Sequence, residues 1–186
     1  MLEFNSIPLL THPFYFVRHG ESVSNLDKTV AGSLDVALTA RGHEQAQATA
    51  AAIEHLGITA IYSSALSRAR DTAGYISRVL ALPVTVIPEL GERNWGELEG
   101  QPLALRVRGL IPNGAETPDQ FMRRVLRGLA KVDASDKPLI VAHSGVFRVL
   151  CRIFGIVESE APVANAQPVR FVPAGEPNQP WRMETP

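Results

Sequence analysis

The stretch "FYFVRHGESVSN", Phe14 to Asn25, joins a short apolar run to a series of polar residues. Four consecutive apolar residues with aromatic and β-branched side chains are typical of a strand buried on both faces of a parallel sheet. Arg18, His19 and Gly20 follow at once, so two basic side chains stand at the end of the expected strand. In an open α/β sheet, this end of a strand is where ligands bind.

Further strand-like and helix-like segments alternate along the chain. This alternation indicates an α/β domain, a three-layer sandwich with a mainly parallel central sheet and helices on both faces. The other expected strands are residues 58–64, 83–89, 138–144 and, near the C-terminus, 168–175 and 180–184. The expected helices are residues 39–57, 66–82, 117–132 and 145–156.

The expected helices carry start and stop signals. Thr39 is predicted to be the N-cap of a helix that stops at Gly57. Thr117 is predicted to be a second N-cap, and Pro118 stands at the first position of that helix. The helix that precedes Pro83 is expected to end before it.

The composition suits one domain, residues 1–186. With 186 residues, 45% of them hydrophobic, the chain can bury roughly 70% of the surface that it exposes when unfolded. Cys151 lies in an apolar helical pattern, which predicts a packed thiol rather than a nucleophile. The sequence shows neither a membrane span nor a secretory signal, so we expect a cytoplasmic protein without membrane contact.

The charges are almost balanced, with 18 Lys and Arg residues against 19 Asp and Glu residues and a net charge of −1. This balance gives no electrostatic reason to expect nucleic acid as a partner, so any preference for anions must be local. The histidines at the strand ends have no cluster of Cys or carboxylate ligands at metal spacing beside them, so no metal and no cofactor are expected.

Basic residues meet if the strands that they follow are neighbours. Arg18 and His19 end one expected strand, and His143 and Ser144 end another. Two imidazoles and a guanidinium in a small volume repel metal cations and attract an oxyanion, for which phosphate is the obvious candidate. Arg68 follows a third strand, near the start of a helix whose N-terminus also favours an anion.

A neutral histidine beside a bound phosphate can attack phosphorus and carry the group covalently. One ring nitrogen must be held by an acceptor, a role that the backbone carbonyl of the following turn can fill. Cations must hold the phosphate charge, and an acid must protonate the leaving oxygen. Four glutamates after the strand 83–89 are candidates for this acid, and the chemistry alone does not choose between them: Glu89, Glu92, Glu97 and Glu99.

Five motifs, in order, resemble those of the histidine phosphatase superfamily, also called the phosphoglycerate mutase-like family. The Arg-His-Gly of the first motif is the hallmark of this family. The resemblance spans most of the chain and implies the phosphoglycerate mutase-like fold. The motifs are "RHGESVSN", "GSLDVALTARGHEQA", "SSALSRARDTA", "LGERNWGELEG" and "VAHSGVFRVL".

The resemblance implies a role for each matching residue. His19 would be the nucleophile that becomes phosphohistidine, and Arg18, Arg68 and His143 would form the phosphate pocket. Among the four glutamates, the resemblance selects Glu92 as the acid that protonates the leaving alcohol and then helps to activate water. Two further residues complete the implied pocket: Asn25 beside the phosphate and Ser144 through its backbone N–H.

The chain departs from the family's mutases in its cap. Those mutases have a longer insertion between the acid loop and the late helix, with basic residues that grip a carboxylate and a second phosphate. Here a short cap insertion, around residues 97–117, fills that space. Its Arg106 and Arg108 either meet a substrate anion or are ordinary surface charges. A short cap favours a phosphatase, which must admit water, over a mutase, which must exclude it.

The sequence therefore predicts a metal-independent phosphomonoester hydrolase that transfers phosphate from a small-molecule ester to His19 and then to water. Two alternatives stay open: a phosphoglycerate mutase, and a non-catalytic module that binds a phosphate ligand. The sequence does not identify the ester. It also leaves the oligomeric state open, with a homodimer as one option.

Overall fold

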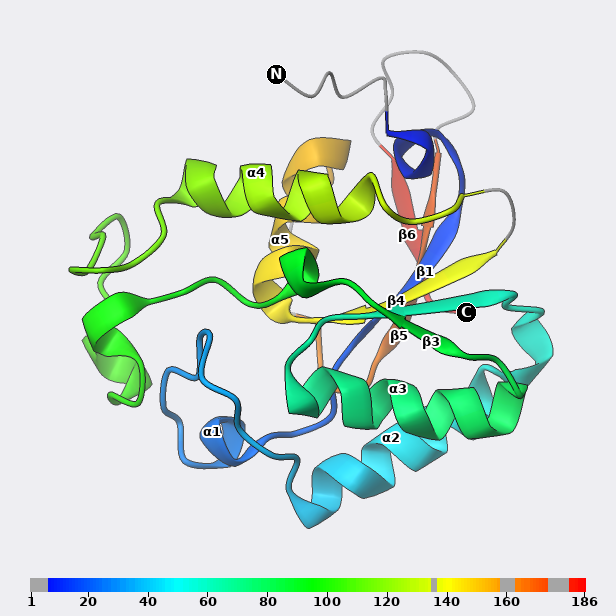
Figure 1. Cartoon of the computed structure of the whole chain (residues 1–186), viewed down its shortest axis with the longest axis horizontal. Helices are drawn as coiled ribbons and strands as arrows, with labels where there is room; N and C mark the ends of the chain where they lie inside the picture. The colour runs from blue at the N-terminus through cyan, green and yellow to red at the C-terminus, as the bar shows by residue number, and fades with distance from the viewer. Residues whose placement is uncertain (1–6, 135–136, 158–162, 174–180) are drawn as a thin grey trace.

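A six-stranded sheet lies at the centre of the computed structural model (Figure 1). The structure describes residues 7–134, 137–157, 163–173 and 181–186. The strands are β1 (Phe14–Arg18), β2 (Ala60–Ser63), β3 (Val84–Val86), β4 (Pro138–Ala142), β5 (Pro168–Val172) and β6 (Arg182–Glu184). Their order across the sheet is β3-β2-β4-β1-β5-β6. The strands from β3 to β1 run parallel, and β5 runs antiparallel to both β1 and β6.

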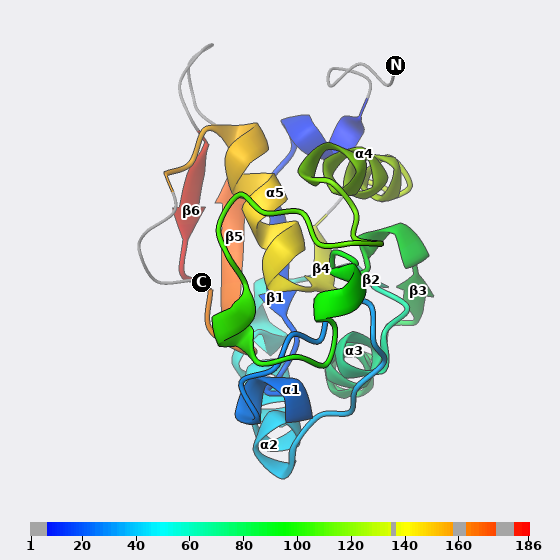
Figure 2. The same ribbon diagram turned by 90° about the vertical axis from the view of Figure 1, so that its left-hand side faces the viewer.

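Helices cover both faces of this sheet. The α-helices are α1 (Val23–Leu26), α2 (Ala40–Ala52), α3 (Ser67–Leu80), α4 (Pro118–Leu129) and α5 (Ser144–Phe154). Figures 1 and 2 show α2 and α3 on one face of the sheet and α4 and α5 on the other. The predicted three-layer α/β sandwich with a mainly parallel sheet is therefore confirmed.

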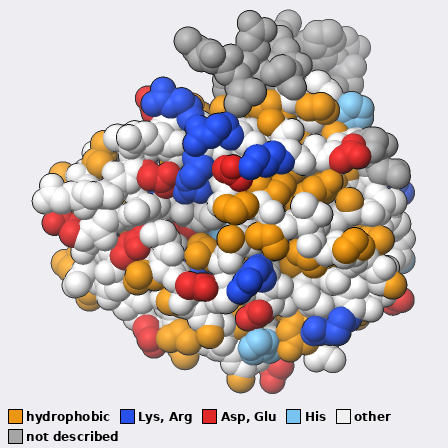
Figure 3. Space-filling view, in the orientation of Figure 1, with side chains coloured by type: hydrophobic (Ala, Val, Ile, Leu, Met, Phe, Trp, Pro, Cys, Tyr) orange, Lys and Arg blue, Asp and Glu red, His pale blue; other side chains and the backbone are white. Residues whose placement is uncertain are grey.

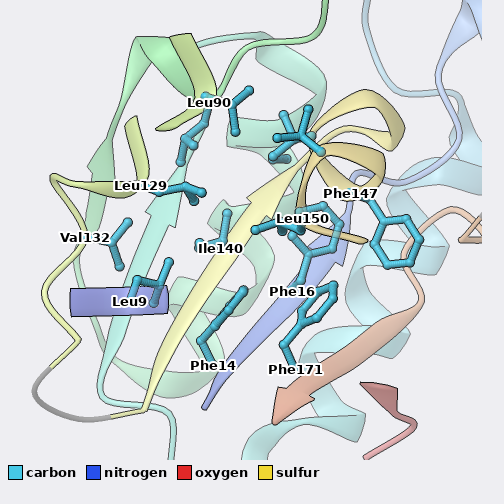
Figure 4. Packing of buried hydrophobic residues seen from close by; sticks show 14 of the residues in the cluster. Leu9, Phe14, Phe16, Leu90, Leu129, Val132, Ile140, Phe147, Leu150 and Phe171 are labelled. Carbon is cyan, nitrogen blue, oxygen red and sulfur yellow. The ribbon is translucent and has the colours of Figure 1, made fainter. Parts of the chain in front are cut away.

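Alternate residues of β1 feed two hydrophobic cores. Phe14 and Phe16 belong to the core beneath α4 and α5, where Phe14 stacks on Phe171 with 5.0 Å between ring centroids (Figure 4). Tyr15 and Val17 belong to the core beneath α2 and α3. Successive side chains of a strand point to opposite faces, so a strand that is apolar at every position is stable only when both faces are covered.

The predicted helix signals are present, with one change at an end. The Thr39 hydroxyl accepts the N–H of Gly42, and Thr117 forms a capping box at the start of α4. The helix expected to reach Gly57 ends at Ala52 and continues as a 3-10 turn. Such tighter turns often close a helix, and Gly57 then takes the left-handed conformation with φ of 66°.

Both late strands are present as β5 and β6. The expected residues 174, 175 and 180 lie outside the described residues. The sequence did not predict α1, whose single turn is too short to carry a periodic apolar pattern. In the described part of the chain, no helix combines the length and the apolar character that a membrane crossing requires.

The parallel register sets the carboxyl ends of three strands side by side. Arg18 of β1 lies opposite Ala142 of β4, and Ser63 of β2 lies opposite Val141. The backbone N–H of His19 donates to the carbonyl of Ala142 at 3.0 Å. The residues that follow β1, β2 and β4 therefore meet at one edge of the sheet.

Candidate active site

A cavity of about 480 Å³ lies at this edge of the sheet. Its walls come from the loop after β1 and from α1, from Arg68 near the start of α3, from the segment between β3 and α4, and from one side each of α4 and α5. Figure 2 faces this region and shows the segment between β3 and α4 passing in front of α5 towards α1. Cavities of this size accommodate small molecules.

His19 is buried beside the cavity with its ring held on one side. Its Nδ1 atom lies 2.7 Å from the carbonyl oxygen of Gly20. Because a carbonyl only accepts, Nδ1 must carry the proton, which leaves the lone pair on Nε2. Burial, followed by the charge of Arg68, lowers the pKa of His19 well below its usual value, so the ring is neutral at pH 7.

His143 packs against His19, with 5.1 Å between ring centroids, and is fully buried. Its Nε2 atom lies 2.7 Å from the hydroxyl of Ser64, which also accepts the backbone N–H of Leu66 at 3.2 Å. A hydroxyl oxygen has two lone pairs, so this contact fits the Ser64 hydroxyl both as the donor to Nε2 and as the acceptor from it. Burial and then the charge of Arg68 lower the pKa of His143 well below its usual value.

Two arginines of the cavity are fixed by backbone carbonyls. Arg68 is almost fully buried and donates to the carbonyls of Leu34 at 2.7 Å and Gly32 at 2.8 Å. Arg18 donates to the carbonyl of Val163 at 2.9 Å. The Nε atoms of both arginines are buried and have no hydrogen-bond partner among the described residues. These guanidiniums therefore hold their positions and bring two positive charges to the cavity that both residues line.

Glu92 is the one carboxylate among the described residues that line the cavity. Its two oxygens accept the backbone N–H groups of Arg93 at 2.7 Å and Gly145 at 2.9 Å, and the Ser144 hydroxyl lies 3.4 Å away. A Cβ atom on Gly145 would lie 1.9 Å from a Glu92 oxygen, so only glycine permits this approach.

The other three candidate acids are occupied elsewhere. Glu89 pairs with Lys131, and Glu97 accepts two hydrogen bonds from Asn113. Glu99 holds the loop at Ser33. None of the three lines the cavity.

The two remaining residues of the predicted pocket also line the cavity. The side-chain oxygen of Asn25 accepts from the backbone of Ser22 and from the side chain of Asn165, both at 3.1 Å, so its NH₂ group is the end that can donate to a ligand. Ser144 is the first residue of α5. The structure thus brings all the predicted site residues to one place, with His143 packed behind His19.

Several residues of the cavity were missed or left undecided by the sequence. Of the two arginines in the cap segment, Arg106 lines the cavity and Arg108 does not. Arg148 and Arg152 of α5 line it as well, and their spacing of four residues was the available signal. The described residues contain no group of three or more His, Cys, Asp or Glu side chains that could hold a metal ion.

Comparison with known proteins identifies the family of this chain. The model of the histidine phosphatase superfamily (branch 1) matches residues 14–172. The "Uncharacterized phosphatase PhoE" of Bacillus subtilis is 36% identical over 141 residues, which cover 72% of each chain. The "Probable phosphoglycerate mutase GpmB" of Erwinia tasmaniensis is 34% identical over 153 residues, which cover 73% of this chain and 71% of that one.

A solved structure shares the fold. The mycobacterial glucosyl-3-phosphoglycerate phosphatase superposes with a TM-score of 0.76 at 23% identity, over 94% of this chain and 98% of the other. The match of the family model extends from β1 through β5 and includes every residue placed at the cavity above. This chain belongs to the histidine phosphatase superfamily.

Proposed function

We propose that this protein is a phosphomonoester hydrolase that works through a phosphohistidine at His19. The observation that carries the proposal is a set of buried nitrogen atoms without a hydrogen-bond partner among the described residues: Arg18 Nε, Arg68 Nε and His143 Nδ1. Buried polar atoms are normally paired, so two guanidinium N–H groups and a ring nitrogen without a partner beside a neutral imidazole favour an anionic ligand with several oxygens.

The first step is an in-line attack on phosphorus. The lone pair of His19 Nε2 forms the P–N bond as the P–O bond to the alcohol breaks, and protonated Glu92 gives its proton to the leaving oxygen. Arg18, Arg68 and His143 hold the charge of the transferring group. The Gly20 carbonyl keeps the ring of His19 in the attacking tautomer.

The second step returns the enzyme to its starting state. Glu92, now ionised, takes a proton from a water molecule whose oxygen attacks phosphorus on the face opposite His19. The P–N bond breaks, inorganic phosphate leaves, and the His19 ring recovers its neutral form. Two in-line transfers account for every atom and proton without a cofactor.

A hydrolase is favoured over a mutase by the segment that would close the site. We propose that residues 97–117 are a short cap within a single domain, 1–186. Residues 101–111 are all exposed, so this segment is open to water on its outer side. The relatives carry both phosphatase and mutase names, so the two activities must be separated by assay.

The experiment that tests the mechanism is rapid quenching of the whole chain after mixing with p-nitrophenyl phosphate. We expect an acid-labile, alkali-stable phosphoenzyme, formed in the presence of a chelator and absent in His19→Ala. His12→Ala, which changes an exposed histidine outside the cavity, is the matched control. Steady turnover without any trapped phosphoenzyme would overturn the mechanism. Phosphoglycerate isomerisation with a bisphosphoglycerate primer would establish the mutase instead.

A further inference from the structure

Glu92, the proposed acid, lies in a loop between β3 and the cap segment, residues 88–94, which we call the acid loop. This loop starts with the 3-10 turn Pro88–Leu90 and continues in irregular structure to Trp95. A proton donor must stand within hydrogen-bond reach of the leaving oxygen. An irregular loop that carries such a donor has to be fixed by contacts from outside it.

Arg124 of α4 fixes the acid loop with every donor that it has. An arginine side chain carries five N–H groups. Three of them donate to backbone carbonyls of the acid loop, at Glu89 (2.9 Å), Gly91 (3.0 Å) and Glu92 (3.0 Å). The other two donate to the carboxylate of Glu116, from Nε at 2.8 Å and from Nη2 at 2.7 Å. The guanidinium thus joins the first part of the acid loop to Glu116.

Glu116 holds the second part of the acid loop. Its backbone N–H donates to the carbonyl of Asn94 at 3.0 Å, and its carboxylate accepts the backbone N–H of Asn94 at 2.9 Å. Its carbonyl accepts Nε of Arg93 at 2.8 Å. The residues on both sides of Glu92 are therefore tied to one ion pair, Arg124–Glu116.

Arg124 differs from the other arginines of α4. Figure 3 shows Lys and Arg side chains gathering over α4 with acidic side chains among them. Arg123 and Arg127 are exposed, whereas the side chains of Arg124 and Glu116 are only 20% and 22% exposed. Although burial opposes it, the hydrogen bond from Arg124 holds the pKa of Glu116 below its usual value. A shielded pair with two parallel hydrogen bonds keeps one geometry, unlike exposed pairs, which contribute little.

The acid loop also packs directly on α4. Leu90 is fully buried in the core beneath this helix. A Cβ atom on Gly128, one turn after Arg124, would lie 2.9 Å from the Leu90 side chain, so glycine permits the close approach. Positions four residues apart share a helix face, so one face of α4 both packs against the loop and donates to it.

We propose that Arg124 is a positioning residue: through its ion pair with Glu116 it holds the acid loop so that the carboxylate of Glu92 stays at the N-terminus of α5, facing the cavity. This inference rests on the proposed function, because it assigns Arg124 to the proton transfer made by Glu92. Neither Arg124 nor Glu116 is among the described residues that line the cavity. Both therefore act through the loop, and their effect should depend on how much protonation the leaving group needs.

The first measurement is the dependence of turnover on the leaving group. Arg124→Gln removes the charge and most of the donors. We expect kcat for phenyl phosphate, a poor leaving group, to fall by about 10- to 100-fold, since a small displacement of a catalytic group costs this much. For 2,4-dinitrophenyl phosphate kcat should fall by less than about threefold, and KM should change little for either ester. Equal falls in kcat for the two esters would overturn the inference.

A double variant tests whether Arg124 acts through Glu92. Glu92→Gln/Arg124→Gln should hydrolyse phenyl phosphate at most about twofold more slowly than Glu92→Gln alone, because residues that act as a unit are not additive. A loss equal to the product of the two single losses would overturn the inference. Glu116→Gln leaves α4 unaltered and should show the same dependence on the leaving group, which keeps the inference testable if Arg124→Gln does not fold. The matched control is Arg123→Gln, an exposed arginine of the same helix, which should change neither rate.

Amide hydrogen exchange followed by NMR tests the position of Glu92 without turnover. Gly145 is the second residue of α5, so its N–H has no partner within the helix, and Glu92 accepts it at 2.9 Å. In Arg124→Gln, exchange at Gly145 should become at least about tenfold faster. Exchange at Phe147, whose N–H donates to the carbonyl of His143 at 3.0 Å, should not change and is the control for general loosening of α5.

The two measurements separate this inference from the proposed function. Faster exchange at Gly145, with no hydrolysis of either ester by the unaltered protein, would reject the hydrolase and keep the positioning of Glu92 by Arg124. Hydrolysis by the unaltered protein, with unchanged exchange at Gly145 in a folded Arg124→Gln variant, would keep the hydrolase and reject the positioning role. Urea titrations establish that each variant is folded.

Discussion

Two parts of the cavity region hold their charged side chains in different ways. At the strand ends, Arg68 is 1% exposed and His143 is 0% exposed, and each is fixed by an oxygen at 2.7 Å. On the cap segment and on α5, Arg106 and Arg152 are exposed, and Arg106 stacks over the ring of Trp95. Fixed donors in a dry site stabilise a transition state without reorganisation, whereas exposed charges adapt at small cost. If the proposed function holds, we expect the strand ends to be preorganised for chemistry and the exposed arginines to adapt to different ligands.

The largest effect after loss of the nucleophile is expected at Glu92. Glu92→Gln keeps the hydrogen-bond acceptor of one oxygen but cannot give a proton, so esters with poor leaving groups should slow by about 10²–10⁴-fold. Esters with good leaving groups need little protonation and should slow much less. Initial rates on a series of aryl and alkyl phosphates measure this, with Glu97→Gln as the control outside the cavity. Equal losses across the series would exclude Glu92 as the acid.

Ser64 tests whether the fixed geometry at the strand ends matters. Ser64→Ala leaves His143 Nε2 without its partner, and a lost buried hydrogen bond costs about 1–3 kcal/mol. We expect kcat to fall by about 10- to 100-fold with little change in KM, and Ser64→Thr to restore most of it. Ser63→Ala removes a neighbouring buried hydroxyl that does not touch His143 and is the control. Equal losses in the Ala and Thr variants would contradict a positioning role.

The buried histidines should make stability depend on pH. The folded-state pKa values of His19 and His143 lie well below those of the unfolded chain, so below about pH 6.5 the unfolded state binds more protons. The free energy of unfolding should therefore fall with pH from about 6.5 downwards, by up to about 1.4 kcal/mol per pH unit for each histidine. Urea titrations between pH 7.5 and 5.5 measure this. The slope should be smaller in His19→Asn, and an unchanged slope would argue against His19 as a source.

The smallest effect is expected at Arg106, in the cap segment. Arg106→Gln removes one exposed cation, so KM for 4-carboxyphenyl phosphate should rise by roughly three- to fivefold, in line with the modest energies of exposed charges. This rise should shrink at high ionic strength, because salt screens exposed charges. Arg108→Gln is the matched control from the same segment. A fall in kcat as large as that expected for Ser64→Ala would contradict the difference between the fixed strand ends and the exposed cap segment.

The sequence predicted that Arg18, His19 and His143 meet at one edge of the sheet, because they follow strands. Arg18 and His143 each stand directly after an apolar run, and parallel strands place such positions side by side. The choice of Glu92 among four glutamates came from family resemblance. The structure supplies an independent reason, since Glu92 alone among them reaches the N-terminus of α5.

Apart from the Gly20 carbonyl beside His19, the contacts that hold the site were beyond sequence reasoning. Ser64 and His143 are 79 residues apart, and their contact depends on the pairing of β2 with β4. The carbonyl of Val163 that fixes Arg18 comes from a segment without any periodic pattern. On α5, the spacing of the arginines is that of an ordinary solvated helix face. Only the position of that helix in the fold shows that Arg148 and Arg152 line the cavity.

The way in which His19 is anchored has a consequence for the evolution of this protein. The partner of its Nδ1 atom is a main-chain carbonyl, which every amino acid possesses. A change at Gly20 keeps this carbonyl, although a Cβ atom there would lie 2.4 Å from the carbonyl oxygen of Gly42, whereas one change at Ser64 deletes the partner of His143 outright. Lineages that drift away from catalysis should therefore lose the support of the second histidine more readily than the orientation of the first.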